Sequence, residues 1–202
     1  MSGLAIGVLI SGSGTNLQAV IEAIERGELD ARVAVVISNK EAAYGLERAR
    51  KHGIAAVFVD PAAFDSRSQY NAAIRDELVS HGVYVVVMAG YMRLLGKEVL
   101  DAYPMRVVNL HPALLPSFPG ANGIRDAFDY GVKVTGVTVH YASEVFDEGP
   151  IIAQEVVHIA EDDTVESLEA KIHAAEHRLL PAALQLIATG RAHVEGRKVR
   201  IG

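Results

Sequence analysis

Short apolar runs alternate with amphipathic stretches through the first two thirds of the chain. Leu4–Ile10 is a continuous apolar run that ends in Ser and Gly, which is typical of a strand buried on both faces. Residues 15–26 follow with apolar side chains at helical spacing. Further strands are expected at 32–38, 56–59, 84–89 and 105–110, and further helices at 44–52, 67–81 and 96–102. We therefore predict an α/β fold in which a mostly parallel, twisted sheet carries helices on both faces and begins with a Rossmann-like half.

The pattern changes in the last third of the chain. Two long β-rich runs, 132–141 and 151–159, predict an antiparallel addition to the sheet near the carboxyl end. Residues 163–190 are helical in pattern, and Pro181 is expected to kink or divide that helix because proline removes a helical hydrogen bond. Residues 192–201 are typical of a small hairpin. No repeat or linker interrupts the chain, so we expect one domain, 1–202.

Composition excludes several classes of protein. Half of the 202 residues are hydrophobic, which argues against disorder. The net charge of −6 gives no reason to expect nucleic acid or an anionic membrane as the main partner. The absence of cysteine excludes disulfides and thiolate metal sites and allows a reducing compartment. The amino-terminal stretch lacks a basic flank and resembles a buried strand more than a signal peptide, so a cytoplasmic protein is expected.

The stretch VVNLHPALLPSFPG carries two polar side chains at the end of an expected strand. Asn109 and His111 are two residues apart, so on an extended backbone they point the same way. The carboxyl ends of strands in open α/β sheets are where ligands bind. Pro112, Pro116 and Pro119 each restrict the backbone of the loop that follows. The sequence therefore predicts an amide and an imidazole beside a stiff loop.

Asp147 gives this pair a chemical interpretation. A carboxylate beside an imidazole favours its protonated form. A cationic His111 and a neutral Asn109 would then stabilise an oxygen that becomes negative in acyl transfer. No Ser or Cys lies in a nucleophile elbow, so direct transfer is favoured over a covalent intermediate. The alternative is that His111 caps the end of a strand and Asp147 belongs to a solvated turn.

A glycine-rich segment, SGSGTN at residues 11–16, lies between the first expected strand and helix. Its turn and the helix start would stabilise a phosphate through free N–H groups. The alternative is an ordinary turn in which Thr15 and Gln18 form a capping box. The segment lacks the lysine of a P-loop and the spacing of a dinucleotide fingerprint, so neither of those functions is favoured.

Four other sets of residues have both a functional and a structural interpretation. His140 ends the 134–140 run, where a buried, hydrogen-bonded histidine is favoured over a functional one. His173 and His177 have the spacing of a metal pair, but no third ligand is evident. Glu176 flanks the apolar stripe of its helix and is either exposed or a ligand of hydroxyl groups. Residues 92–95 follow a strand at the ligand edge, as a binding wall or a hydrophobic hinge.

Six segments together resemble the phosphoribosylglycinamide formyltransferase family, the folate-dependent enzymes of purine synthesis. They run along essentially the whole chain and are VLISGSGTNLQAVI, ISNKEAAYGLERA, VVVMAGYMRLLG, VVNLHPALLPSFPG, VTVHYASEVFDEGPIIAQ and HAAEHRLLP. The fourth and fifth segments are specific to folate formyltransferases and their relatives. The first favours the branch that acts on glycinamide ribonucleotide.

The resemblance implies roles for particular residues. The catalytic trio would be Asn109, His111 and Asp147. The substrate phosphate would be held by Gly14, Thr15 and Asn16, and its ribose by Glu176 with His173 nearby. The folate would contact Asn109 and Asp147 and also Arg67, Met92, Arg93, Leu94, Leu95, Ser143, Glu144, Val145 and Phe146.

The implied reaction is direct transfer of the formyl group of 10-formyltetrahydrofolate to the amine of glycinamide ribonucleotide. Both are small molecules, and no metal, nucleic acid or membrane is implied. Residues 1–103 would form the phosphate-binding half, and residues 104–202 the catalytic and folate-binding half. The resemblance is compatible with a monomer or a homodimer.

One position departs from the family pattern. After PSFPG the family usually has a small or apolar residue and then a histidine, and here the second position is Asn122. The usual histidine is thought to support the catalytic carboxylate. Asparagine donates a hydrogen bond but carries no charge, so the tuning of Asp147 is in question. We expect the trio to form, with reduced activity.

Three other functions are compatible with parts of the pattern. A formyltetrahydrofolate hydrolase would use similar residues but pass the formyl group to water, and such enzymes usually carry an amino-terminal regulatory domain. A methionyl-tRNA formyltransferase would need an additional domain and a basic surface. A non-catalytic sensor of a phosphate ligand would not need the trio of Asn109, His111 and Asp147.

Overall fold

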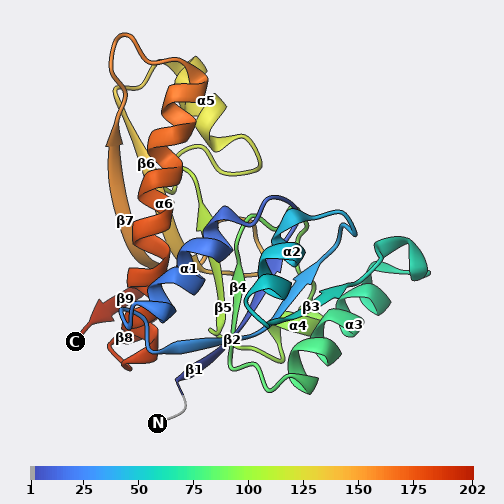
Figure 1. Ribbon diagram of the computed structural model, residues 1–202. Coiled ribbons are helices and arrows are strands. Elements are labelled where there is room, and N and C mark those ends of the chain that lie inside the picture. The colour runs from blue at the N-terminus through green and yellow to red at the C-terminus, as the bar shows by residue number, and fades with distance from the viewer. Residues whose placement is uncertain (1–2) are drawn as a thin grey trace.

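The computed structural model describes residues 3–202 and shows a single nine-stranded sheet in the order β3-β2-β1-β4-β5-β6-β7-β9-β8 (Figure 1). Met1 and Ser2, which the expected domain includes, lie outside the described residues. The strands are β1 (Leu4–Ile10), β2 (Ala31–Ser38), β3 (Ala55–Phe58), β4 (Val85–Met88), β5 (Val107–His111), β6 (Val134–Tyr141), β7 (Ile151–His158), β8 (Ala192–Glu195) and β9 (Lys198–Ile201). The helices are α1 (Thr15–Glu25), α2 (Tyr44–Lys51), α3 (Arg67–Ser80), α4 (Lys97–Leu100), α5 (Gly123–Tyr130) and α6 (Val165–Ala188), with a 3-10 turn at Pro61–Ala63.

Strands β3, β2, β1, β4 and β5 are parallel, which confirms the prediction for the first part of the chain. Their apolar side chains enter two cores, one on each face of the sheet. The first core includes Ile6 of β1 and Leu17 of α1, and the second includes Leu9 of β1 and Ile74 of α3. Burial on both faces explains why β1 is a continuous apolar run rather than an alternating one.

The second part of the sheet is the predicted antiparallel addition. β5 pairs with β6, and β6 with β7, in antiparallel fashion. The β8–β9 hairpin is also confirmed, and β9 joins the start of β7 in parallel at a single pair, Ile151 with Lys198. This hairpin extends the sheet beyond β7 near the carboxyl terminus (Figure 1).

Helix α6 is continuous across Pro181, so of the two expected effects of this proline, a kink or a division, the division is wrong. The helix packs along α1, β6 and β7 (Figure 1), and its buried residues include Leu168 and Leu184 on either side of the proline. Burial of that long apolar face outweighs the loss of one helical hydrogen bond. A capping box of Thr164 and Ser167 fixes its first turn.

The first helix starts differently from the prediction. Gly14 is the N-cap of α1, in a left-handed conformation with φ 69°, and makes no side-chain cap. The predicted capping box of Thr15 and Gln18 is therefore wrong, because Thr15 already lies inside the helix. The start of α1 and the end of β5 lie at the same carboxyl edge of the sheet.

Within residues 3–202, no helix has both the length and the apolar composition that crossing a membrane requires.

Candidate active site

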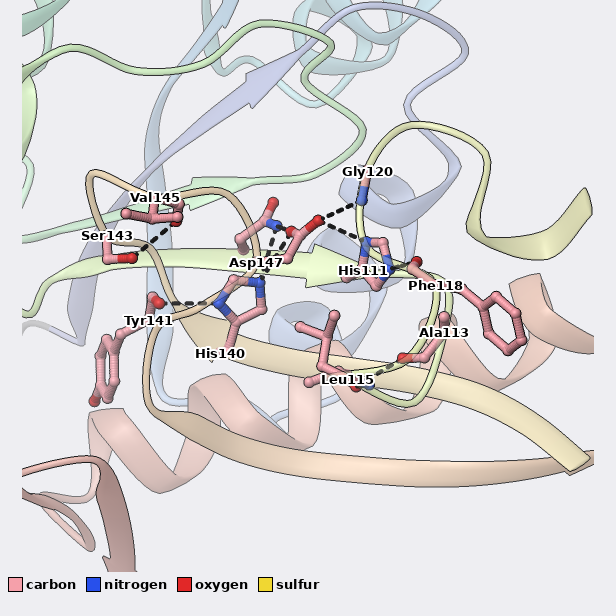
Figure 2. A network of polar contacts seen from close by, with 12 residues as sticks. His111, Ala113, Leu115, Phe118, Gly120, His140, Tyr141, Ser143, Val145 and Asp147 are labelled. Carbon is pink, nitrogen blue, oxygen red and sulfur yellow. Dashed lines mark hydrogen bonds and ion pairs between the residues drawn. The ribbon is translucent and has the colours of Figure 1, made fainter. Parts of the chain in front are cut away.

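The carboxylate of Asp147 is the centre of a buried polar cluster (Figure 2). Its Oδ2 lies 3.5 Å from His111 Nδ1 and accepts a 2.8 Å hydrogen bond from the Gly120 backbone N–H. Its Oδ1 lies 3.6 Å from His140 Nε2 and accepts a 3.4 Å hydrogen bond from Asn109 Nδ2. The structure therefore brings the three predicted catalytic side chains together, and it adds His140 to them.

Sheet register places three of these side chains. Asn109 and His111 lie on β5, two residues apart as expected. His140 lies on the antiparallel strand β6, directly opposite Asn109. Opposed residues in an antiparallel pair bring their side chains within contact distance, which explains the 3.1 Å between Asn109 Nδ2 and His140 Nε2.

Asp147 reaches the cluster from the loop between β6 and β7. Its φ of 55° is unusual for a residue other than glycine and turns the carboxylate inward. Two residues later, a Cβ on Gly149 would lie 1.6 Å from the Tyr141 carbonyl oxygen, so only glycine fits there. Gly149 lets the loop pass this close to the Tyr141 carbonyl oxygen, and this path carries Asp147 into the cluster.

The surroundings of Asp147 keep it ionised. Burial works to raise its pKa, but the contact with His140, the Gly120 N–H and the nearby His111 ring all act in the other direction. The net effect is a pKa below the usual value for aspartate. A carboxylate held charged in a buried site can stabilise a neighbouring imidazolium.

His111 lies between two hydrogen-bond acceptors. Its Nε2 is 2.8 Å from the carbonyl oxygen of Phe118, and its Nδ1 faces Asp147 (Figure 2). Because a carbonyl and a carboxylate only accept, a ring with both nitrogens protonated satisfies both neighbours. Phe118 has a φ of 53°, so the proline-rich loop bends sharply where it holds His111.

The glycine-rich segment is packed against α2. A Cβ on Gly14 would lie 2.7 Å from Gly45 Cα, and the Gly45 N–H donates to the Gly12 carbonyl at 3.1 Å. Arg48 of α2 donates through Nε to the Ser13 carbonyl at 2.9 Å. The turn is therefore fixed before any ligand is bound, with Thr15 opening α1.

Three of the expected substrate residues meet beside this turn. Glu176 Oε2 accepts a 3.0 Å hydrogen bond from Asn16 Nδ2 and lies 2.8 Å from His173 Nδ1. The hydrogen bond to Glu176 raises the pKa of His173 above its usual value. Asn16 Oδ1 is buried and has no partner, so an acceptor is left for a ligand donor. Glu176 is buried, which removes the alternative of a solvated side chain.

His173 and His177 do not form a metal site here. Their rings stack with centroids 6.5 Å apart, and His173 Nδ1 is used by Glu176. Among residues 3–202, no group of three or more His, Asp or Glu side chains is placed to hold a metal ion.

The expected folate residues form two segments near the trio. Arg67 donates to the Leu94 carbonyl at 2.8 Å, and the Arg93 guanidinium lies over the Tyr70 ring. Leu95 is buried in the second core, whereas Met92 is 68 % exposed. Residues 92–95 thus combine an exposed apolar side chain, Met92, with a buried one, Leu95, and the choice between a binding wall and a hydrophobic hinge stays a prediction.

The second segment precedes Asp147. Ser143 Oγ donates to the Val145 carbonyl, and Glu144 pairs with Lys97 of α4 at 3.1 Å. Val145 and Phe146 expose more than half of their surface. Exposed apolar side chains beside a buried polar cluster suit a flat, partly apolar ligand.

Two hollows lie away from these two segments. One of about 390 Å³ lies behind the proline-rich loop and is lined by Leu114, Phe118 and Tyr130, among others. The other, about 290 Å³, lies on the outer side of α1 and includes Thr15, Arg48 and His177. Geometry of the polar groups, and not the size of a hollow, identifies the candidate site.

Sequence reasoning missed three contributors to the site. His140 was expected to be buried and hydrogen-bonded, which is confirmed, but its place opposite Asn109 was not foreseen. The Gly120 N–H holds Asp147. Ser11 Oγ accepts from the Met92 N–H at 2.9 Å and so joins the glycine-rich turn to residues 92–95. Only His140 had a signal in the sequence, because it ends a strand of the expected antiparallel addition to the sheet.

Asn122 does not support Asp147 in this structure. It is the exposed N-cap residue of α5 and makes no side-chain cap. The hydrogen bond to Asp147 comes instead from the Gly120 backbone N–H.

Comparisons with known proteins agree with the geometry. The formyl transferase family model matches residues 4–184 and ends before β8 and β9. The phosphoribosylglycinamide formyltransferase of Bacillus subtilis (strain 168) is 39 % identical over 178 residues, which is 88 % of this chain and 91 % of that protein. The crystal structure of glycinamide ribonucleotide transformylase 1 from Symbiobacterium toebii has 52 % identity and a TM-score of 0.97, over 99 % of this chain and 94 % of that one. The trifunctional purine biosynthetic protein adenosine-3 of Gallus gallus is 41 % identical over 94 % of this chain, which spans 19 % of that protein.

Proposed function

The chain belongs to the formyl transferase family and is a one-carbon transferase of purine biosynthesis, and from that premise we propose its substrates and mechanism. The donor is 10-formyltetrahydrofolate and the acceptor is the amine of glycinamide ribonucleotide. The products are N-formylglycinamide ribonucleotide and tetrahydrofolate. The observation that carries this proposal is the meeting of Asn109, His111 and Asp147 in one buried cluster near the glycine-rich turn.

The amine of the acceptor attacks the formyl carbon, and the carbonyl oxygen becomes negative. Protonated His111 and the amide of Asn109 stabilise that oxygen. The Asn109 N–H that points to Asp147 is the one available, because its 3.4 Å hydrogen bond is long. His111 must also be released by the Phe118 carbonyl, so the proline-rich loop shifts when substrates bind.

Collapse of this intermediate breaks the bond between the formyl carbon and folate N10. The amine loses one proton and N10 gains one, so the overall reaction is balanced without a metal or a redox step. Asp147 keeps the charge of His111 stable throughout, and its lowered pKa leaves it ionised at neutral pH. Proximity of the two substrates supplies the remaining rate enhancement.

The acceptor is proposed to bind with its phosphate at Gly14, Thr15 and Asn16 and its ribose at Glu176, with His173 nearby. A fixed turn at a helix start supports the phosphate role. The folate is proposed to lie between residues 92–95 and 143–147, with Arg67 reaching its benzoylglutamate tail. Its partners are thus small molecules. The monomeric or dimeric state, the two halves of the domain and a cytoplasmic location stay predictions.

One assay tests this function. The protein is given 10-formyltetrahydrofolate with and without glycinamide ribonucleotide, and both the deformylated folate and the formylated ribonucleotide are measured. We expect equal amounts of the two products and no turnover without the amine. Equal folate turnover in the absence of the amine would identify a hydrolase instead, and binding of both ligands with no turnover would identify a sensor.

A further inference from the structure

The loop that carries Asp147 is held from outside the catalytic cluster by the carboxyl-terminal hairpin. Arg197 lies in the turn between β8 and β9, and its Nη1 donates a 2.7 Å hydrogen bond to the Glu148 carbonyl oxygen. Glu148 directly follows Asp147 in the chain. The single β9–β7 pair, at Lys198 and Ile151, keeps the hairpin turn beside this loop.

Asp147 needs such a restraint because its backbone is in an unfavourable conformation. A φ of 55° in a residue other than glycine persists only where the surroundings enforce it. On the carboxyl side of Asp147, Gly149 is wedged against the Tyr141 carbonyl, and the Tyr141 N–H donates to the Pro150 carbonyl at 2.9 Å. Arg197 supplies the remaining polar contact on that side.

The cluster is sensitive to a small movement of this loop. Asp147 lies 3.5 Å from His111 Nδ1 and 3.6 Å from His140 Nε2, both beyond ordinary hydrogen-bond length. A shift of a few tenths of an ångström therefore either tightens or loses these contacts. A restraint on the peptide that follows Asp147 therefore affects the charge interactions of Asp147 with His111 and His140.

The hairpin is stiff enough to act as a support. Backbone pairing joins β8 to β9 from the Ala192–Ile201 pair to the Glu195–Lys198 pair, and Arg191 Nε donates to the Gly202 carbonyl oxygen at 2.5 Å, whereas the exposed Arg200–Glu195 ion pair adds little. None of these contacts involves the loop of Asp147. The hairpin thus has its own cohesion, and Arg197 is the residue that connects it to that loop.

We propose that Arg197 is a positioning residue for Asp147 and that the β8–β9 hairpin supports the active site through the Arg197–Glu148 hydrogen bond. This inference rests on the role of Asp147 in the proposed function. Arg197 touches neither substrate nor reacting atoms in this scheme. It acts by holding the peptide that follows Asp147.

The kinetic test compares Arg197→Ala with Arg200→Ala, which removes a cation from the same hairpin but leaves the loop contact intact. Arg197→Ala is expected to lower kcat about threefold to tenfold, which corresponds to the net contribution of one ordinary hydrogen bond, with KM for the amine unchanged. Arg200→Ala should keep the parent kcat. Arg197→Lys, which retains a donor, and guanidinium added to Arg197→Ala should each recover part of the loss.

A spectroscopic test is independent of turnover. The carboxyl carbon of Asp147 is followed by NMR against pH in the free protein. We expect the pKa of Asp147 to rise toward its usual value in Arg197→Ala and to stay low in Arg200→Ala. Unchanged kcat and an unchanged Asp147 titration in Arg197→Ala would overturn the inference. Absence of formyl transfer in the parent protein would defeat the proposed function, while the titration would still decide the role of Arg197.

Discussion

Asn109 and His140 face each other across the β5–β6 pairing, with the amide Nδ2 3.1 Å from the imidazole Nε2. The other ring nitrogen of His140 lies 2.9 Å from the Tyr141 carbonyl oxygen. Because a carbonyl only accepts, that nitrogen carries the hydrogen, and Nε2 is left to accept from the amide. The contact fixes the orientation of Asn109 and so directs its second N–H toward Asp147.

Replacing His140 tests this orientation. His140→Gln keeps an acceptor for the amide, whereas His140→Leu removes it and leaves a buried N–H without a partner. We expect His140→Leu to lower kcat toward the loss typical of one oxyanion donor, about 10²–10³-fold, and His140→Gln to lower it less. Steady-state kinetics gives the comparison, and thermal melts exclude unfolding as the cause. Equal losses in the two variants would contradict the orienting role.

Asp147→Asn tests the charge of the cluster. The folded pKa of Asp147 is lowered, so its favourable contribution is present above the unfolded value and is lost as pH falls through the folded value. The titration of Asp147 should therefore not change parent activity around neutral pH. We expect Asp147→Asn to lower kcat with little change in either substrate's dissociation constant, because the charge matters when the imidazolium stabilises the oxyanion. A changed dissociation constant with an unchanged kcat would argue against that role.

Glu176→Gln tests the pH dependence of the acceptor site. The hydrogen bond to Glu176 raises the pKa of His173, so the charge of that ring is present at lower pH and is lost as pH rises through the raised value. We expect affinity for the phosphate-bearing acceptor to weaken over that same pH range above 6.5. In Glu176→Gln the midpoint should move down. Calorimetry at several pH values measures the affinity, and a midpoint that stays in place would exclude His173 as the titrating group.

Much of the sheet was predictable because its signals are local. Leu4–Ile10 has the predicted bounds, since it is an apolar run that ends at a polar residue. The strand expected at 105–110 instead runs from Val107 to His111, because Met105 has a φ of 52° and cannot continue an extended strand. The helix expected at 96–102 is shortened to Lys97–Leu100.

The candidate site was predictable only in part, for a physical reason. The relation of Asn109 to His111 follows from strand geometry, two residues apart on one strand. The contacts of Gly120, Phe118 and Arg197 are made by backbone groups or from remote elements, and no side-chain pattern reports them. At Pro181 the sequence pattern predicted a kink or a division, whereas burial of the apolar face keeps helix α6 continuous.

Asn122 offers a test of how the chain manages without the usual histidine. Its side chain is exposed and makes no cap, and Asp147 is held by the Gly120 N–H. We expect Asn122→Ala to change kcat by less than about twofold, the usual range for a surface substitution away from special features. Asn122→His should also leave kcat near the parent value. If the position supported Asp147, Asn122→His would instead raise kcat. Paired kinetics of the two variants decides between these outcomes.

Gly123 is the residue whose small size matters most beside His111. A Cβ at this position would lie 3.2 Å from both His111 Nε2 and the Phe118 carbonyl oxygen, tighter than ordinary contacts. Gly123→Ala should improve the intrinsic helix propensity of α5 but push apart the 2.8 Å hydrogen bond between those two groups. We expect a lower kcat together with an unchanged or higher melting temperature, because the added methyl pushes the His111 ring from its place beside Asp147 and leaves the core intact. Gly131→Ala is a control of the same kind, since a Cβ there meets nothing within 4 Å, but its φ of 82° should lower the melting temperature without changing kcat. A Gly123→Ala protein with parent kcat would show that the space beside His111 is not needed for turnover.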